Sequence, residues 1–183
     1  MANNHDQATV QPLIPESLIH PVEVALLRGF GFEHEAEQQQ GCNMLYFYAE
    51  NGTSDEFSGD LPALPGEVSG PGSELVDELR SYYLVHGMDP ETGEEDAFLD
   101  DLPTSWTDIF QRIARRMRDA GLDDYAIVVQ GAYYCDKMRS GEFGGWVTVI
   151  SPESIQSGST YKLAEEFKAR AQRAHQAHQS PRP

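Results

Sequence analysis

The stretch "TSWTDIFQRIARRMRDAGLDD", residues 104–124, is the clearest helix signal in the chain, and the fold prediction starts from it. Ser105 and Asp108 have the spacing of a capping box, and Gly121 stands where a helix often ends. The apolar residues of this stretch recur at helical intervals and share one predicted face: Trp106, Ile109, Phe110, Ile113 and Met117. An apolar face of this kind predicts a second structural layer against which the helix packs.

A hairpin of two strands is predicted after this helix. "YAIVVQGAYYC" (125–135) and "GWVTVIS" (145–151) are rich in β-branched and aromatic residues, which favour strands. The last periodic segment, residues 159–179, predicts an amphipathic helix with four inward residues: Leu163, Phe167, Ala171 and Ala174. The second half of the chain is therefore predicted to be α-β-β-α.

The first half of the chain has weaker patterns. Helices are predicted over residues 21–28 and 73–87, because apolar residues recur there at helical spacing and a Gly follows each segment. "NMLYFYAENG" (43–52) predicts a strand, with residues 53–57 as its short hairpin partner. Residues 33–41 are polar and are expected to form a solvated helix or a loop. Residues 88–103 are expected to form a solvated acidic loop.

These elements predict an α+β fold in which an antiparallel sheet packs against several amphipathic helices. A length of 183 residues fits a single domain. We expect one compact domain over residues 12–174, with an acidic half that ends at about residue 101. Residues 1–11 and 175–183 are polar and are expected to be flexible tails.

Charge is distributed very unevenly along the chain, whose formal net charge is −17. Residues 1–101 contain 21 Asp and Glu residues but only two basic residues, Arg28 and Arg80. Residues 102–183 instead carry a net charge of +2. An acidic surface of this kind repels nucleic acid and anionic membranes, and it attracts basic partners. The alternative interpretation is that the acidity serves solubility alone.

The densest group of acids lies in the segment 88–103, and a loop of mixed charge lies between the two strands of the predicted hairpin. Both segments are polar and are expected to face solvent. From this density of charge we predict nine residues that bind a protein partner: Glu91, Glu94, Glu95, Asp96, Asp100, Asp101, Lys137, Arg139 and Glu142.

The hairpin loop, within "YYCDKMRSGEFGGW" (133–146), also raises an enzymatic alternative. Cys135 could act as a nucleophile if the neighbouring charges activated its thiol. A base would then be required, and no histidine occurs in the sequence between His86 and His175. Cys135 is more simply interpreted as a small buried residue at the end of a strand. The loop itself is then either structural or a binding loop.

No cofactor site and no metal site are predicted. The segment "SGEFGG" (140–145) has neither the P-loop pattern nor the dinucleotide fingerprint. Residues 89–101 are acidic, but they fail the alternation that an EF-hand loop requires. His175 and His178 have a spacing that can share a metal on a helix, but no cysteine or carboxylate accompanies them.

The chain is therefore interpreted as a non-enzymatic binding protein. Its acidic half would occupy a basic, nucleic-acid-binding surface of a partner protein, because carboxylates and phosphates both present oxygen acceptors to Arg and Lys. Direct binding to nucleic acid or to a membrane is not expected. A small enzyme that uses the loop Cys135–Glu142 and a general accessory interaction protein are the alternatives.

In size, in charge and in its lack of an enzyme motif, the chain resembles the small acidic anti-defence proteins of phages and plasmids, such as anti-restriction and anti-CRISPR inhibitors. This resemblance implies an inhibitor that mimics nucleic acid. The N-terminus has no signal-peptide pattern, and the two cysteines are far apart in the sequence. Both features predict a cytoplasmic protein with free thiols.

Overall fold

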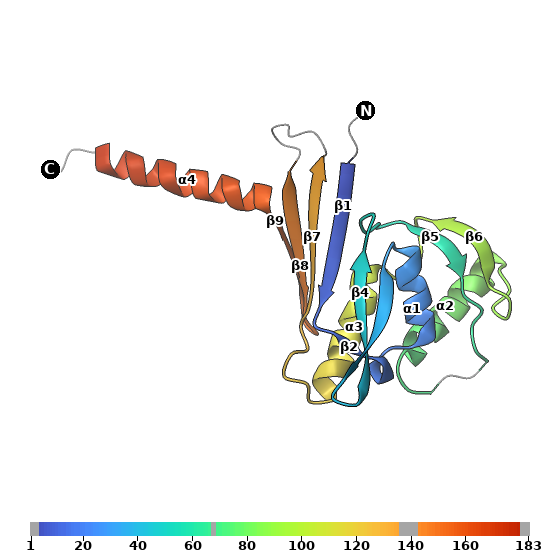
Figure 1. Ribbon diagram of the computed structural model, residues 1–183. Coiled ribbons are helices and arrows are strands. Elements are labelled where there is room, and N and C mark those ends of the chain that lie inside the picture. Colours follow the sequence, from blue (N-terminus) through green and yellow to red (C-terminus); the bar gives the residue numbers. More distant parts are fainter. Residues whose placement is uncertain (1–3, 67–68, 136–142, 180–183) are drawn as a thin grey trace.

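The computed structural model describes residues 4–66, 69–135 and 143–179 (Figure 1). Within these residues the fold is α+β, as predicted, with four α-helices, a seven-stranded antiparallel sheet and a separate two-stranded sheet. The elements follow in chain order: β1 (Asn4–Gln11), β2 (Ile14–Pro15), the 3-10 helix η1 (Glu16–Leu18), α1 (Pro21–Gly29), β3 (Glu33–Gln39), β4 (Cys42–Ala49), β5 (Phe57–Leu61), α2 (Ser73–His86), β6 (Glu94–Leu99), α3 (Trp106–Asp119), β7 (Ile127–Cys135), β8 (Gly144–Ile150), β9 (Ile155–Ser159) and α4 (Thr160–Gln179).

The large sheet combines strands from both halves of the chain. β1 lies between β4 and β7 and is antiparallel to both. β8 and β9 extend the sheet beyond β7, while β3 and the short β2 both pair with β4. The predicted hairpin is confirmed, because Ile127 of β7 is the partner of Ile150 of β8 and Tyr133 is the partner of Gly144.

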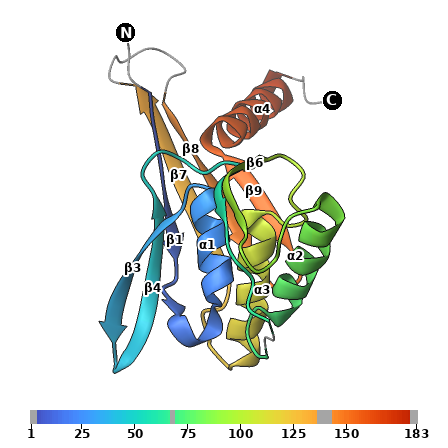
Figure 2. The same ribbon diagram turned by 90° about the vertical axis from the view of Figure 1, so that its right-hand side faces the viewer.

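One face of the large sheet is covered by α1 and α3, and we call it the inner face (Figures 1 and 2). Residues that alternate along the strands are buried against these helices: Val10, Leu45, Phe47, Val129 and Ile150. The predicted apolar face of α3 is confirmed, because Trp106, Ile109, Phe110, Ile113 and Met117 are all buried. The opposite face, which we call the outer face, carries no helix along the described strands.

The capping prediction for α3 is also confirmed. Ser105 is the residue before the helix, its hydroxyl accepts a hydrogen bond from the backbone N–H of Asp108 at 3.2 Å, and the Asp108 carboxylate accepts one from the Ser105 N–H at 3.0 Å.

On the facing sheet, the indole of Trp146 lies directly against Gly131. A Cβ at position 131 would stand only 2.4 Å from Trp146 Cε2, so this close approach requires glycine.

The prediction that residues 1–11 form a flexible tail was wrong. Residues from Asn4 to Gln11 form β1, a strand inside the large sheet that is paired along its length with β7. Only Ala8 and Val10 of this strand are buried apolar residues, so its side chains carry little of the usual strand pattern. The backbone hydrogen bonds to its neighbours hold the strand in place.

Three expectations for the acidic half were also wrong. The segment 33–41 contains the edge strand β3, and residues 53–57 are not the partner of β4, because β4 pairs with β3, β1 and β2. β5 pairs instead with β6, which occupies part of the predicted acidic loop 88–103. Strands that face solvent on one side need few apolar residues, and this explains why the sequence pattern missed them.

The helix α4 projects from the body of the molecule on the side of the outer face (Figure 1). The prediction that its apolar residues pack inward was wrong, because Leu163 is 48% exposed and Phe167 is 54% exposed. The side chains of Ala171 and Ala174 lie outside the described residues. The helix continues to Gln179, so part of the segment 175–183 is helical rather than a flexible tail.

Two adjacent tyrosines on α2 should limit the stability of the fold at alkaline pH. Burial raises the pKa of Tyr83 to about 12, and its hydroxyl donates a hydrogen bond to the Pro62 carbonyl at 3.0 Å. Burial also raises the pKa of Tyr82 to about 12, and its hydrogen bond to Asp101 and the charge of that residue contribute further. Between about pH 10 and about pH 12 the folded chain keeps protons that the unfolded chain loses. The free energy of unfolding should therefore fall across this window, by roughly 2–3 kcal/mol for each tyrosine.

Urea unfolding at a series of pH values from about 9 to about 12 measures this fall. The variant Tyr83→Phe should be less stable at the lower pH values, by about 1 kcal/mol, because it loses a hydrogen bond. It should also lose less stability across the window than the wild-type protein. An equally steep fall in both proteins would contradict the role of Tyr83.

Candidate functional site

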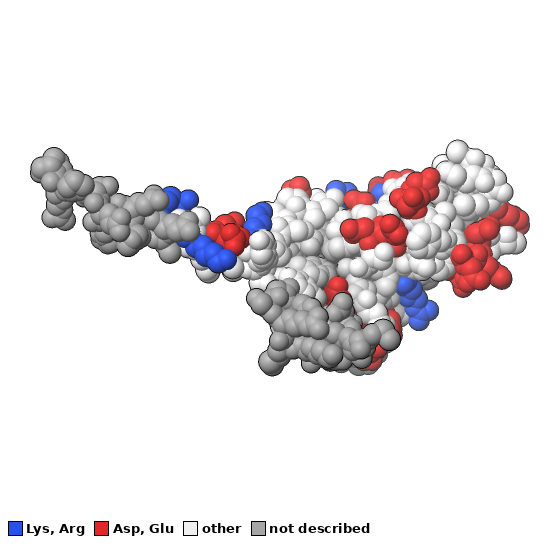
Figure 3. All heavy atoms as spheres, turned by 90° about the horizontal axis from the view of Figure 1, so that it is seen from above, with Lys and Arg blue, Asp and Glu red and all other residues white. Residues whose placement is uncertain are grey.

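Six of the nine predicted partner-binding residues lie together at the end of the molecule formed by β5 and β6. Glu94, Glu95 and Asp96 belong to β6, Glu91 precedes the strand, and Asp100 and Asp101 follow it. All six are exposed, and we call this group the acidic end. Figure 3 shows Asp and Glu side chains gathered over the part of the molecule that carries β5 and β6, with Lys and Arg on α4.

The backbone of the acidic end is held firmly although its side chains face solvent. Ala97 of β6 is buried, as are Phe57 and Leu61 of the paired strand β5. The Asp96 N–H donates a hydrogen bond to Asp60 Oδ1 at 3.1 Å. At Gly93, where φ is +74°, a Cβ would stand 2.1 Å from the Leu61 carbonyl oxygen, so glycine is needed for this close approach. The carboxylates are therefore presented from an ordered strand.

Most carboxylates of the acidic end have no basic partner in the part of the chain that the structure describes. Within the described ranges no Lys, Arg or His forms an ion pair with five of the six: Glu91, Glu94, Glu95, Asp96 and Asp100. Asp101 is the exception, because it accepts a hydrogen bond from the Tyr82 hydroxyl at 2.9 Å and lies 3.8 Å from His86 Nε2. As far as the described residues go, the other five carboxylates remain available to a cation from outside.

The arginines of α3 are used inside the protein instead. Arg112 contacts Glu78 at 2.7 Å, and Arg116 contacts the buried Glu23 at 2.6 Å. Arg118 contacts Glu153 at 2.5 Å. Arg112 and Arg116 thus pair with the acidic first half of the chain. They are not arranged as a basic surface for phosphates.

The other three predicted partner-binding residues, Lys137, Arg139 and Glu142, lie outside the described residues. The structure does place Cys135, the candidate nucleophile, at the end of β7. Its exposed fraction is only 3%, and the thiol is free. A nucleophile has to reach its substrate, so this burial favours the interpretation of Cys135 as a packing residue.

A second acidic group lies on the outer face of the large sheet, and sequence reasoning missed it. Glu33, Glu35 and Glu37 are exposed on β3, opposite Tyr48, Tyr46 and Met44 of β4. Antiparallel partners share a face, so the register defines one row across six strands: Glu33, Tyr48, Thr9, Gln130, Val147 and Gly158. The outer face therefore changes from acidic at β3 to polar at β1 and β7 and apolar at β8.

Two tyrosines lie beside this acidic edge, and the charge of the edge affects the pKa of one of them, Tyr48. The rings of Tyr46 and Tyr48 stack with centroids 5.6 Å apart, and the Tyr48 hydroxyl donates to Glu33 Oε2 at 3.5 Å. Partial burial raises the pKa of Tyr48, and the negative charges of Glu33, Glu35 and Glu50 raise it further. The alternation of Glu at every second position from 33 to 37 was the sequence signal for this surface, since it is typical of one face of a strand.

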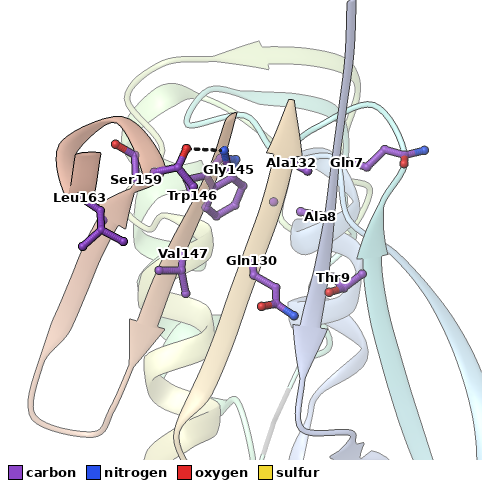
Figure 4. A pocket seen from close by; sticks show the side chains of 13 residues that line it. Gln7, Ala8, Thr9, Gln130, Ala132, Gly145, Trp146, Val147, Ser159 and Leu163 are labelled. Atoms are coloured by element: carbon purple, nitrogen blue, oxygen red, sulfur yellow. Dashed lines mark hydrogen bonds between the residues drawn. The ribbon is translucent and has the colours of Figure 1, made fainter. Parts of the chain in front are cut away.

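An apolar groove occupies the opposite end of the outer face, beside the first turn of α4 (Figure 4). Its volume is about 700 Å³, and its lining includes Ala132, Gly145, Val147 and Leu163. The Gly145 N–H donates a hydrogen bond to Thr160 Oγ1 at 3.0 Å, which fixes the start of α4 against β8. Small residues, Ala132 on β7 and Gly145 on β8, form part of the floor of the groove.

Comparison with known proteins adds no family to this description. The chain matches no protein-family model, and no significant match was found among curated proteins or solved structures. In the part of the chain that the structure describes, no group of His, Cys, Asp and Glu side chains is arranged to hold a metal ion. None of the described helices is both long and apolar enough to cross a bilayer.

Proposed function

We propose that the protein is a non-enzymatic binding protein whose acidic end occupies a basic, nucleic-acid-binding surface of a partner protein. One observation carries the proposal: five exposed carboxylates around β6 have no basic partner among the described residues. A surface of this kind attracts Arg and Lys side chains that otherwise contact phosphates. An inhibitor of a nucleic-acid-binding host defence complex would have such a partner.

The way the carboxylates are held supports this proposal. They extend from a paired strand and the turns that flank it, so little backbone order has to be gained on binding. They are also exposed in the free protein. Exposed charges at the rim of an interface mainly increase the rate of association with a partner of opposite charge. The interaction is therefore expected to weaken as salt is added.

Neutralising four carboxylates of the acidic end should slow association with the partner. In the variant Glu91→Gln/Glu94→Gln/Glu95→Gln/Asp96→Asn the formal charge changes from −17 to −13. The association rate at low salt should fall about tenfold, with a smaller effect on dissociation, because exposed charges contribute to steering. The partner is first captured on the immobilised wild-type protein at low salt, and the rates are then measured by surface plasmon resonance.

A matched variant separates the position of the charges from their number. Glu16→Gln/Glu50→Gln/Asp123→Asn/Asp124→Asn removes the same charge from exposed carboxylates elsewhere on the molecule that form no ion pair among the described residues. It should change the association rate less than the acidic-end variant does. The captured protein should itself bind nucleic acid, and duplex DNA or RNA should displace this protein from it. A partner that binds equally well in high salt, or is not displaced by nucleic acid, would overturn the proposal.

A further inference from the structure

The outer face and α4 both expose apolar side chains that the described part of the chain leaves uncovered. Val147 and Val149 of β8 are 37% and 38% exposed, while Leu163 and Phe167 stand one helical turn apart on α4. In Figure 1, α4 leaves the sheet and points away from it, so that the sheet and the helix form an L. The helix in this position cannot cover the outer face of its own chain.

The two surfaces carry opposite charge. α4 has four exposed basic residues, Lys162, Lys168, Arg170 and Arg173, against two acids, Glu165 and Glu166. Arg170 continues the side of the helix that carries Leu163 and Phe167, and its guanidinium lies 5.8 Å from the Phe167 ring centre. This side of α4 is thus apolar near the sheet and basic farther out. The outer face changes in the same way from apolar β8 to acidic β3.

The dimensions of the two surfaces also agree. The 20 residues of α4 correspond to a helix about 30 Å long. The outer face from β9 to β3 spans six strands, which corresponds to about 24 Å at the usual strand spacing. A helix of this length can lie across the whole sheet, with its apolar start over β8 and its basic part over the acidic edge.

We propose that α4 of one copy docks on the outer face of a second copy, and that the exchange is reciprocal. Each chain supplies both complementary surfaces, which is the requirement for a two-fold symmetric contact. Two L-shaped molecules can interlock so that each helix lies on the sheet of the other. Leu163 and Phe167 then meet Val147 and Val149 of the second copy, and Arg170 lies toward its acidic edge.

This dimer is independent of the function proposed for the acidic end. The carboxylates around β6 belong to the small two-stranded sheet, whereas the outer face belongs to the large sheet. Loss of the dimer would leave the acidic end unchanged, and neutralising the acidic end would leave the dimer intact. The two proposals therefore fail in different experiments.

Sedimentation equilibrium of the full chain tests the proposal at protein concentrations up to about 100 μM, where a micromolar dissociation constant gives mostly dimer. The wild-type protein should have twice the mass of the chain. The variant Leu163→Glu/Phe167→Glu should be monomeric, because it places four carboxylates from two copies in the apolar contacts. The control Leu84→Glu/Val85→Glu makes the same change at two exposed sites on α2, which are 66% and 80% exposed, and it should remain dimeric.

A mixing experiment tests whether the helix contacts the sheet. The face variant Val147→Glu/Val149→Glu should also be monomeric, and a mixture with the helix variant should form a heterodimer through the one contact that stays intact. Its affinity should be at least about tenfold below that of the wild-type dimer, since one of two contacts is lost. Circular dichroism confirms that each variant is folded. Glu33→Lys/Glu35→Lys/Glu37→Lys is a second face variant, at the exposed acidic edge formed by β3.

Three results would overturn the proposal. A wild-type protein that stays monomeric would show that the outer face is left open or is covered by its own α4. A dimer that survives both the helix and the face variants would have another interface. A dimer that the helix variant breaks while the folded face variants leave it unchanged would be formed by two α4 helices packing on each other.

Discussion

Replacing Arg116 by methionine should lower the free energy of unfolding by about 3–5 kcal/mol, because it leaves a buried carboxylate without its cation. Glu23 has an exposed fraction of 0%. Arg116 Nη2 donates to both carboxylate oxygens of Glu23, at 2.6 Å and 2.8 Å. After the substitution, the backbone N–H of His20, at 2.9 Å, would be the one remaining hydrogen-bond donor to this carboxylate among the described residues. Methionine keeps much of the apolar stem of arginine, so the loss comes from the charge.

Equilibrium unfolding in urea measures this effect, and two further variants identify its cause. Arg112→Met removes a neighbouring arginine of α3 whose acidic partners, Glu74 and Glu78, are 86% and 45% exposed. It should cost less than about 1 kcal/mol, as exposed ion pairs usually do. The double variant Glu23→Leu/Arg116→Met removes the buried carboxylate together with its cation and should recover at least half of the loss. Equal losses for Arg112→Met and Arg116→Met would contradict the special role of the buried pair.

Replacing Phe110 by alanine should cost about 3–5 kcal/mol of stability through the cavity that it leaves. Phe110 is fully buried at the centre of an aromatic cluster that connects α3 to the sheet. Its ring forms T-shaped pairs with the rings of Phe32 and Phe47, at 5.2 Å and 5.8 Å between ring centres. These neighbours come from β4 and from the turn before β3, so the cavity would open between the two layers of the fold.

The matched control for this prediction is Phe98→Ala on β6. The Phe98 side chain is 69% exposed, so its removal should change the free energy of unfolding by less than about 1 kcal/mol. Urea unfolding followed by circular dichroism gives both values under the same conditions. A loss below about 1 kcal/mol for Phe110→Ala would mean that the site collapses around the missing ring or that the ring does not support the core.

The elements with strong local patterns were predictable from the residue order. Apolar residues at helical spacing and the pair Ser105 and Asp108 predict the helix around Phe110. The β-branched residues of β7 and β8 predict the hairpin. These patterns act over a few neighbouring residues, so they can be read without knowledge of the rest of the chain. The uneven distribution of acids is likewise a property of the residue order.

The partners of each strand could not be predicted in the same way. β1 and β3 are held by backbone hydrogen bonds to distant segments, and these bonds leave little trace in side chains that face solvent. The three glutamates of β3 form an edge of the large sheet because β3 pairs with β4 on one side only, and this pairing is not visible in the residue order. The density of acids around β6 is visible in the residue order, but only the structure shows that five of these carboxylates have no basic partner among the described residues, while arginines of α3 pair with acids of the same chain.

The sequence of residues 159–179 specifies an amphipathic helix, yet it says nothing about what covers the apolar side. That outcome depends on where the sheet ends and in which direction the chain leaves β9, and both are properties of the packed molecule. Because Thr160 is held at β8 and α4 then points away, Leu163 and Phe167 remain exposed. Local periodicity determines that a face is apolar, whereas the arrangement of distant segments determines whether that face belongs to the core or to an interface.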